Sequence, residues 1–216
     1  MKIPLIIALL AAAAYGQDIK VLLDNDWVKV THIIDHPGDK RPTHTHKDSV
    51  VIALTDHKRR VIGETTRDID VKANAAMWFA DVTHSEENIG KTDGELLIVD
   101  VKKRSGANAA DTMDAVTAAP KNHKILFEND RVRVLAVTVE PGEKEPLHKH
   151  TMPAVIYVIA REDILDTDSG GKTLLDTRAL KDPPTKNFAV WIGSQPAHHV
   201  QNRAKTPVKL IRVELK

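Results

Sequence analysis

Short runs of aliphatic residues, in which apolar and charged positions alternate, recur along the chain from about residue 20 to its end. The segments Val28–Val30 and Val132–Val134 show this alternation most clearly. A period of two places successive side chains on opposite faces of a strand, so one face of each strand is expected to be buried and the other to meet solvent. Turn sequences such as Pro37-Gly38 and Pro141-Gly142 separate the runs. The pattern predicts an all-β protein, with a sandwich or a barrel in each half.

The two halves of the chain repeat one pattern. Moving residues 20–46 forward by 104 positions places them on residues 124–150 without a gap, and further along the offset becomes 114. A repeat of about 100 residues matches a small domain and is too long for a solenoid unit. We therefore expect two tandem domains, at residues 17–103 and 121–216.

The segment between the repeats has a different composition. Lys103–Pro120 is rich in Ala, Ser, Asp and Thr and closes on a proline. We expect an interdomain linker over residues 104–120, with a helical turn around Ala109–Val116. A lid over a binding site is the alternative, because long loops often carry function.

Residues 1–16 have the pattern of a secretory signal peptide. One lysine precedes an apolar run from Ile3 to Ala14, and Ala14–Gly16 forms a small-x-small cleavage site. The run is shorter than the roughly 20 residues that cross a bilayer. We expect an exported protein, periplasmic or secreted, that is free of the membrane after cleavage; an N-terminal helix packed on the domain is the alternative.

Composition narrows the chemistry and the partners. The chain has no cysteine, so any metal must be held by imidazole or carboxylate and not by thiolate. Lys and Arg number 31 against 30 Asp and Glu, without a basic stripe, which argues against nucleic acid and anionic membranes as partners. A small-molecule ligand or substrate is the expected partner, and a homo-oligomer is left open.

Each half carries a pair of histidines with metal-ligand spacing. His44 and His46, like His148 and His150, stand two residues apart, so in a strand both imidazoles point to one face. A third histidine lies at the same relative place in each half; these are His84 and His198. Three neutral imidazoles would hold one ion and leave coordination positions open, as catalytic metal sites do.

These motifs resemble those of the cupin family. Gly38 and Gly142 each precede a His-x-His by five residues, and His84 and His198 each open a His-x-x-x-Asn. The resemblance covers almost the whole mature chain and implies a bicupin: two tandem jelly-roll β-barrels joined by a linker. It also implies a metal inside each barrel, held by His44, His46 and His84 in the first and by His148, His150 and His198 in the second.

The chain departs from the family at its glutamate ligand. The glutamate is expected at position 50 or 51 and at 154 or 155, where Val50, Val51, Ala154 and Val155 stand. Asp48 is the only acid close to the first His-x-His, but it lies outside the expected ligand position. Sites of three histidines without the glutamate resemble those of some cupin dioxygenases that hold ferrous iron. A divalent transition metal is therefore expected, with Fe, Mn or Zn ahead of Ni or Cu.

The other candidate residues carry less of the argument. His32, His36, His57 and His123 have no partner in the other half and are expected to be structural or solvated. Trp78 and Trp191 precede the third histidine of each half by similar distances. We expect them in the core, and a place at the barrel mouth is the alternative. Met152, Tyr157 and Phe188 are expected to give the second half a larger and more aromatic pocket.

Two functions remain open from the sequence. One is an exported metal-dependent oxygenase that acts on a small organic substrate. The other is a non-catalytic small-ligand or metal-binding module, because no general acid or base is evident. Phosphate loops, serine nucleophile motifs and close carboxylate pairs are not evident either, so phosphoryl transfer, serine hydrolysis and glycoside cleavage lack sequence support.

Overall fold

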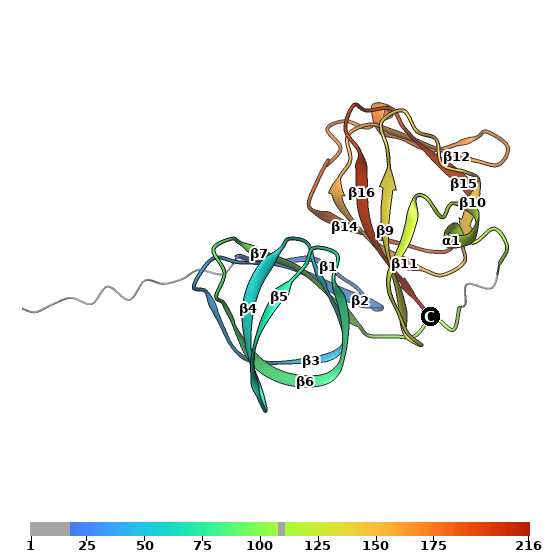
Figure 1. Cartoon of the computed structure of the whole chain (residues 1–216). Helices are drawn as coiled ribbons and strands as arrows, with labels where there is room; N and C mark the ends of the chain where they lie inside the picture. The colour runs from blue at the N-terminus through green and yellow to red at the C-terminus, as the bar shows by residue number, and fades with distance from the viewer. Residues whose placement is uncertain (1–17, 108–110) are drawn as a thin grey trace, which may run out of the picture.

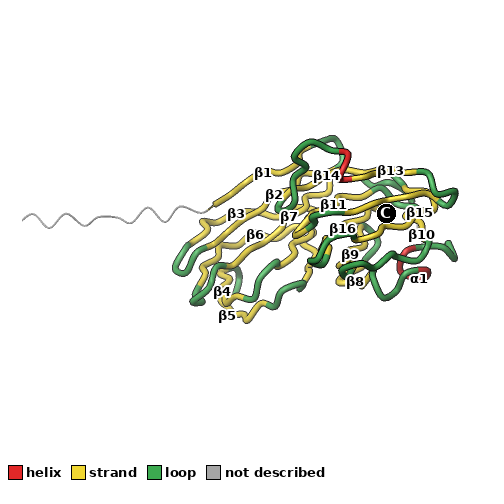
Figure 2. Tube along the Cα trace, turned by 90° about the horizontal axis from the view of Figure 1, so that it is seen from above, coloured by secondary structure: helices red, strands yellow, loops and turns green. Residues whose placement is uncertain are grey.

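A computed structural model describes residues 18–107 and 111–216, so the expected signal peptide lies outside the described residues. The structure is nearly all β, which confirms the expected all-β class but does not show the two closed barrels (Figures 1 and 2). Seven strands form one antiparallel sheet in the order β1-β2-β7-β3-β6-β4-β5. Their bounds are β1 Asp18–Asp24, β2 Val28–Asp35, β3 Lys40–Ala53, β4 His57–Ile62, β5 Thr66–Val71, β6 Ala76–Asn88 and β7 Gly94–Val101.

The second half forms two further antiparallel sheets, in the orders β14-β11-β16-β9-β8 and β10-β15-β12-β13. Every described sheet draws its strands from one half of the chain, and the sheets end in edge strands such as β1 and β5 instead of closing into rings of paired strands. The bounds are β8 His123–Glu128, β9 Val132–Val139, β10 His148–His150, β11 Ala154–Ala160, β12 Ile164–Asp168, β13 Thr173–Asp176, β14 Phe188–Ile192, β15 Gln195–Asn202 and β16 Val208–Leu215.

One asparagine in each half fastens the Pro-Gly turn that precedes the histidine pair. Gly38 and Gly142 adopt positive φ values of 88° and 76°, which glycine reaches without strain. The Gly38 N–H donates to the Asn88 carbonyl at 2.8 Å, and the Gly142 N–H donates to the Asn202 carbonyl at 3.0 Å. The side-chain amide of Asn88 donates to the carbonyl of Asp35, which precedes this turn. The His-x-x-x-Asn motif therefore ties the strand of the third histidine to the turn before the first two.

A single hydrophobic core joins the two halves. Val28, Val30, Val50 and Val99 from the first half pack in one cluster with Val134, Val155, Val213 and Leu215 from the second. Trp27 stacks on Trp191 at the edge of this cluster, with 5.8 Å between ring centroids. Figure 1 shows the blue-to-green strands of the first half meeting the yellow-to-red strands of the second along this surface. The repeated tryptophan Trp191 thus packs against the core, as does Trp78.

The linker ends on the second half. Its helix, α1, spans Ala115–Ala118, later than the expected turn around Ala109–Val116. Asp114 caps this helix and is buried beside the Arg133 guanidinium, to which it is joined by two hydrogen bonds of 2.8 and 2.9 Å. The end of the linker is therefore anchored to β9. Within the described residues, no helix has the length and hydrophobicity needed to span a membrane.

The structure separates the two positions at which the missing glutamate ligand was expected in the second half. Val155 is completely buried in the core between the halves, opposite Val213, and so faces away from the histidines. Ala154, its neighbour, pairs with Glu214, whose carboxylate contacts His150. Of the two expected positions in the second half, Ala154 therefore lies on the histidine side and Val155 does not. In the first half strand pairing makes Ser49, opposite Asp100, the counterpart of Ala154, one residue before the expected positions 50 and 51.

Val155→Glu should destabilise the protein without tightening metal binding, because it places an unpaired charge in an apolar core. We expect the free energy of unfolding to fall by at least about 3 kcal/mol. Ile125→Glu is the matched control, since Ile125 lies on β8 with 45% of its surface exposed. Urea denaturation of both variants tests the placement, and equal stabilities would contradict it.

Candidate metal centres

Backbone pairing brings the first three histidines together. His44 and His46 lie on β3, and His84 lies directly opposite His44 on β6. One ligand nitrogen from each of the three lies within 4.8 Å of the others. The Nε2 atoms of His44 and His46 are 3.1 Å apart. Two nitrogens that both bind the same tetrahedral ion at about 2.0–2.1 Å are roughly 3.3 Å apart, so the observed separation suits one metal ion shared by both rings.

Hydrogen bonding leaves the right nitrogens of this cluster available. The Nδ1 of His44 is 2.8 Å from the Pro42 carbonyl oxygen, so Nδ1 carries the proton and the Nε2 lone pair is free. The Nε2 of His84 is buried without a hydrogen-bond partner among the described residues, and its closest carboxylate oxygen, on Glu86, is 3.6 Å away. An orphaned buried nitrogen that faces two converging imidazoles fits a divalent ion.

Burial keeps these imidazoles neutral, which is the form that binds metal. The pKa of His46 is lowered to about 4, mainly by burial and in smaller part by the neighbouring His44 and His84. The pKa of His84 is also lowered to about 4, first by burial and then by His44. Burial likewise lowers the pKa of His44.

Buried ion pairs occupy the interior of the first half next to this cluster. The Arg59 guanidinium donates to Glu86 at 2.6 Å and lies 3.3 Å from an Asp35 carboxylate oxygen. Arg41 donates to Glu86 and lies 3.3 Å from Asp35. Two acids and two guanidinium groups therefore balance one another inside the first half.

The second half gathers four histidines. His148 on β10 lies directly opposite His198 on β15, and His150 follows on the same face of β10. The fourth is His123, the first residue of β8, which the sequence left without a role. The ligand nitrogens of His123, His148 and His150 lie within 4.8 Å of one another. The His198 ring joins them, with its centroid 4.6 Å from that of His148 and 5.6 Å from that of His150.

The group of ligand nitrogens that converges in the second half is therefore His123, His148 and His150, whereas the expected set was His148, His150 and His198. The His198 ring lies beside this group. At offset 104 the first half has Ile19 at the place of His123, so the repeat contained no clue to it. The position of His123 depends on helix α1, which ends just before it. The His123 Nδ1 is 3.3 Å from the carbonyl oxygen of Ala119, the residue that follows this helix. A fourth imidazole makes the second cluster richer in ligands than the first.

A chain of buried charges orients His150. Its Nδ1 is 2.9 Å from an oxygen of Glu214, which has no exposed surface. Glu214 accepts a 2.6 Å hydrogen bond from Arg133, whose guanidinium is also bound to Asp114. A carboxylate behind a ligating histidine fixes the ring and raises the basicity of the other nitrogen. Proline carbonyls do the same for the other two expected ligands, Pro146 for His148 at 2.8 Å and Pro196 for His198 at 2.9 Å.

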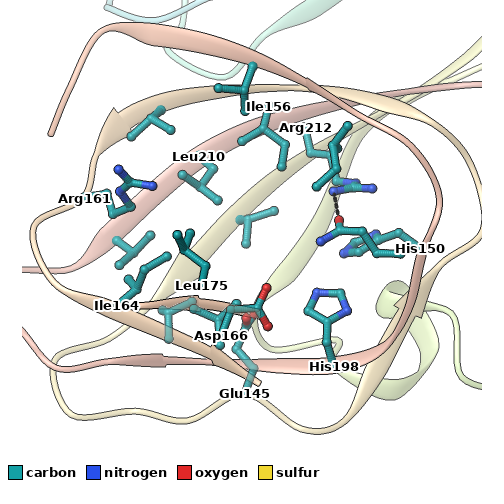
Figure 3. Close-up of a pocket in the computed structure, with 18 of the residues that line it drawn as sticks. Glu145, His150, Ile156, Arg161, Ile164, Asp166, Leu175, His198, Leu210 and Arg212 are labelled. Carbon is teal, nitrogen blue, oxygen red and sulfur yellow. Dashed lines mark hydrogen bonds between the residues drawn. The ribbon is translucent and has the colours of Figure 1, made fainter. Parts of the chain in front are cut away.

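The second cluster opens into a cavity of about 260 Å³ (Figure 3). Aliphatic side chains from seven strands form most of its wall, and Phe188 is the phenyl side chain among them. Tyr157 instead packs in the core between the halves, so the expected aromatic pocket is mainly aliphatic. The aliphatic residues are Val137, Val139, Ile156, Val158, Ile164, Leu175, Val190, Ile192, Val200, Val208 and Leu210.

Two buried carboxyl groups line this cavity beside the histidines. Figure 3 shows Glu145 and Asp166 next to each other and close to His198. The pKa of Glu145 is raised to about 8, mainly by burial and in smaller part by the charges of Glu143 and Asp166. Burial also raises the pKa of Asp166 to about 6. This carboxylate pair could not be expected from the sequence, because the two residues are 21 positions apart and are brought together only by their pairing with β15.

Acid should destabilise the metal-free protein through the buried imidazoles. Unfolded histidines take up a proton near pH 6.5, whereas burial holds the pKa of His46, His84 and His198 at about 4 in the folded chain. The unfolded state therefore binds more protons below pH 6.5, and the free energy of unfolding falls as the pH falls. The raised pKa values of Glu145 and Asp166 act in the opposite direction, so the histidine effect is measured against a histidine variant. Between about pH 7 and about pH 5, we expect the melting temperature of chelator-treated wild type to drop by at least about 5 °C more than that of His84→Gln/His198→Gln.

Two variants separate this effect from general acid sensitivity. The double variant His84→Gln/His198→Gln should lose part of the drop. His36→Ala should retain it, since His36 is exposed and its pKa is raised by its hydrogen bond to Asp93. A drop of the same size in the double variant and in the wild type would contradict the neutral buried imidazoles.

Comparisons with known proteins identify the fold. No protein-family model and no curated protein matches the sequence. The crystal structure of AerE from Microcystis aeruginosa is similar, with a TM-score of 0.60 and 11% identity over 93% of this chain and 92% of that chain. A variant of Bacillus subtilis oxalate decarboxylase has a TM-score of 0.61 with 13% identity, over 92% of this chain and 72% of that one. Another oxalate decarboxylase structure from that organism, studied for its Mn(II) centres, has a TM-score of 0.53 with 15% identity, over 88% of this chain and 69% of that chain. At these identities the likeness shows the fold alone, and that fold is a cupin-like arrangement of antiparallel sheets.

Proposed function

We propose that this chain is an exported bicupin that binds divalent metal in both halves and acts as a metal-dependent oxygenase in the second. The proposal takes residues 17–103 and 121–216 as the two cupin domains, joined by residues 104–120. One observation carries it: the histidine cluster of the second half opens into a cavity of about 260 Å³. That volume is at the small end of ligand pockets, which measure roughly 300–1,000 Å³, and suits a small organic molecule.

The residues of the second half divide the work. His148, His150 and His198 would hold the ion, with His123 as a fourth ligand. When bound, the ion would supply a Lewis-acid or redox centre with positions open to a substrate. Glu214 orients His150, and the aliphatic wall excludes water from the reacting groups. Glu145 and Asp166 place two carboxyl groups beside the substrate, where one can hold or release a proton.

The first half supports the alternative function, metal binding without turnover. Its three imidazoles, His44, His46 and His84, are arranged as ligands, but Arg41 and Glu86 pair where the second half has open space. A bound ion in this half would meet charged groups on that side instead of an apolar cavity. We therefore assign catalysis to the second half and metal binding alone to the first.

Metal analysis together with oxygen uptake tests the assignment. One ion per cluster predicts about two metal equivalents per chain after reconstitution with Fe(II), Mn(II) or Zn(II). The oxygen electrode then measures turnover of iron-loaded protein with a panel of diketones, catechols and thiols. We expect uptake with at least one member of the panel.

Matched double variants identify the active half. His44→Ala/His46→Ala and His148→Ala/His150→Ala should each lose about one metal equivalent. Only the second double variant should abolish oxygen uptake. Less than half an equivalent in the wild type would remove the metal-binding proposal, and two equivalents without any uptake would favour the non-catalytic alternative.

A further inference from the structure

The second half has two buried acids without a cation to balance them. Among the described residues, no lysine or arginine nitrogen lies within 4.0 Å of Glu145 or Asp166. The Oε1 of Glu145 and the Oδ1 of Asp166 are buried without a hydrogen-bond partner among those residues. The only ion-pair contact of Glu145 is with the Nδ1 of His123, at 3.8 Å, and that nitrogen is 3.3 Å from the Ala119 carbonyl oxygen instead.

The two acids are close neighbours. Asp166 on β12 pairs with Val200 on β15, and the Glu145 N–H donates to the Val200 carbonyl oxygen at 2.9 Å. One residue of β15 therefore has both acids beside it. Only 4% of Glu145 and 9% of Asp166 is exposed, so water contributes little to satisfying them. A buried polar group without a partner is costly, so such a pair in a native protein calls for an explanation.

The first half shows how this fold satisfies buried acids with its own residues. At offset 104, Glu145 stands where the first half has Arg41, and at offset 114 Val200 stands where it has Glu86. In the first half this position holds a guanidinium paired with a carboxylate. At the corresponding place the second half has the carboxyl groups of Glu145 and Asp166, without guanidinium groups to balance them. Val139 and Ile164 replace the remaining members, Asp35 and Arg59, with aliphatic side chains.

The arginines that line the cavity are engaged elsewhere. Arg212 donates to Glu214 at 3.0 Å and to Gln195 at 2.7 Å. Arg161 donates to the Pro184 carbonyl oxygen at 3.0 Å and lies over the Phe188 ring, 5.2 Å from its centroid. Figure 3 shows both arginines apart from the two carboxyl groups. The arginines of the cavity therefore do not supply a counter-charge to the two acids, and a ligand that brings its own cation could do so.

We propose that Glu145 and Asp166 bind the ammonium group of a small aliphatic amine, whose carbon chain lies against the aliphatic wall of the cavity. This proposal rests on the proposed function, because it takes the cavity as the substrate site. An ammonium has three N–H donors, enough to serve both unpartnered oxygens, and its charge relieves the repulsion between two neighbouring carboxylates. Val139, Ile164, Leu175, Val200 and Val208 supply the apolar contacts. The substrate class is therefore an alkylamine or a molecule that ends in one.

Butylammonium and its neutral analogue 1-butanol distinguish a charged ligand from an apolar one. Isothermal titration calorimetry of the full mature chain, both metal-free and metal-loaded, should show butylammonium binding at least about tenfold more tightly than 1-butanol. Glu145→Gln and Asp166→Asn should each weaken butylammonium binding about tenfold or more and leave 1-butanol unchanged. Glu162→Gln is the matched control, since Glu162 is exposed and lies just before β12, the strand of Asp166. This variant should bind butylammonium as tightly as the wild type does.

Three results would overturn the proposal: equal binding of butylammonium and 1-butanol, unchanged butylammonium binding in both acid variants, or no butylammonium binding to the wild type. If the acid variants do not fold, the comparison of the two ligands on the wild type still decides. Metal content is measured separately on the same samples. Loss of metal with intact amine binding would therefore overturn the proposed metal function alone, and the reverse result would overturn this inference alone.

Discussion

The antiparallel pairing between the strand of the histidine pair and the strand of the third histidine is the constraint on which each site depends. It sets His44 opposite His84, and His148 opposite His198. Side chains directly opposite in such a pair have Cβ atoms only about 4.5–5.5 Å apart, so the register alone brings the imidazoles within reach of one ion. A slip of one residue would turn the third histidine to the other face. The asparagine that closes each His-x-x-x-Asn protects this register, because its backbone exchanges hydrogen bonds with the turn before the histidine pair.

The same backbone supports two different interiors. The first half fills the space beside its histidines with Arg41, Arg59, Asp35 and Glu86, which satisfy one another. The second half lines that space with aliphatic side chains and two carboxyl groups that lack a counter-charge. Removing one partner of a buried ion pair leaves the other charge uncompensated, and the second half has carboxyl groups at this place without the guanidinium groups that pair with them in the first. A duplicated domain can in this way keep its metal ligands while only one copy keeps room for a substrate.

The linker takes part in the second site in a way that has no counterpart in the first. Asp114, which caps helix α1, accepts hydrogen bonds from Arg133. Arg133 also donates to Glu214, and Glu214 in turn contacts His150. The same segment leads into β8 and so delivers His123 to the cluster. In the first half Ser49 donates to Asp100 at 2.6 Å at the place where the second half has Ala154 and Glu214. The second cluster is therefore more firmly oriented, and this fits its assignment as the catalytic one.

The sequence by itself determined the strand-rich class and the six repeated histidines, because alternation and i, i+2 spacing act locally and need no knowledge of the final packing. It also identified the Pro-Gly turns, since the repeat preserved them in both halves. Only the tertiary structure decided that His123 joins the second cluster and that Glu145 meets Asp166, because these contacts cross from strand to strand. It also decided that Val155 faces the core. The offset of 104 would match Val155 with Val51, whereas strand pairing matches it with Val50. A shift of one residue exchanges the two faces of a strand, and sequence spacing alone could not resolve it.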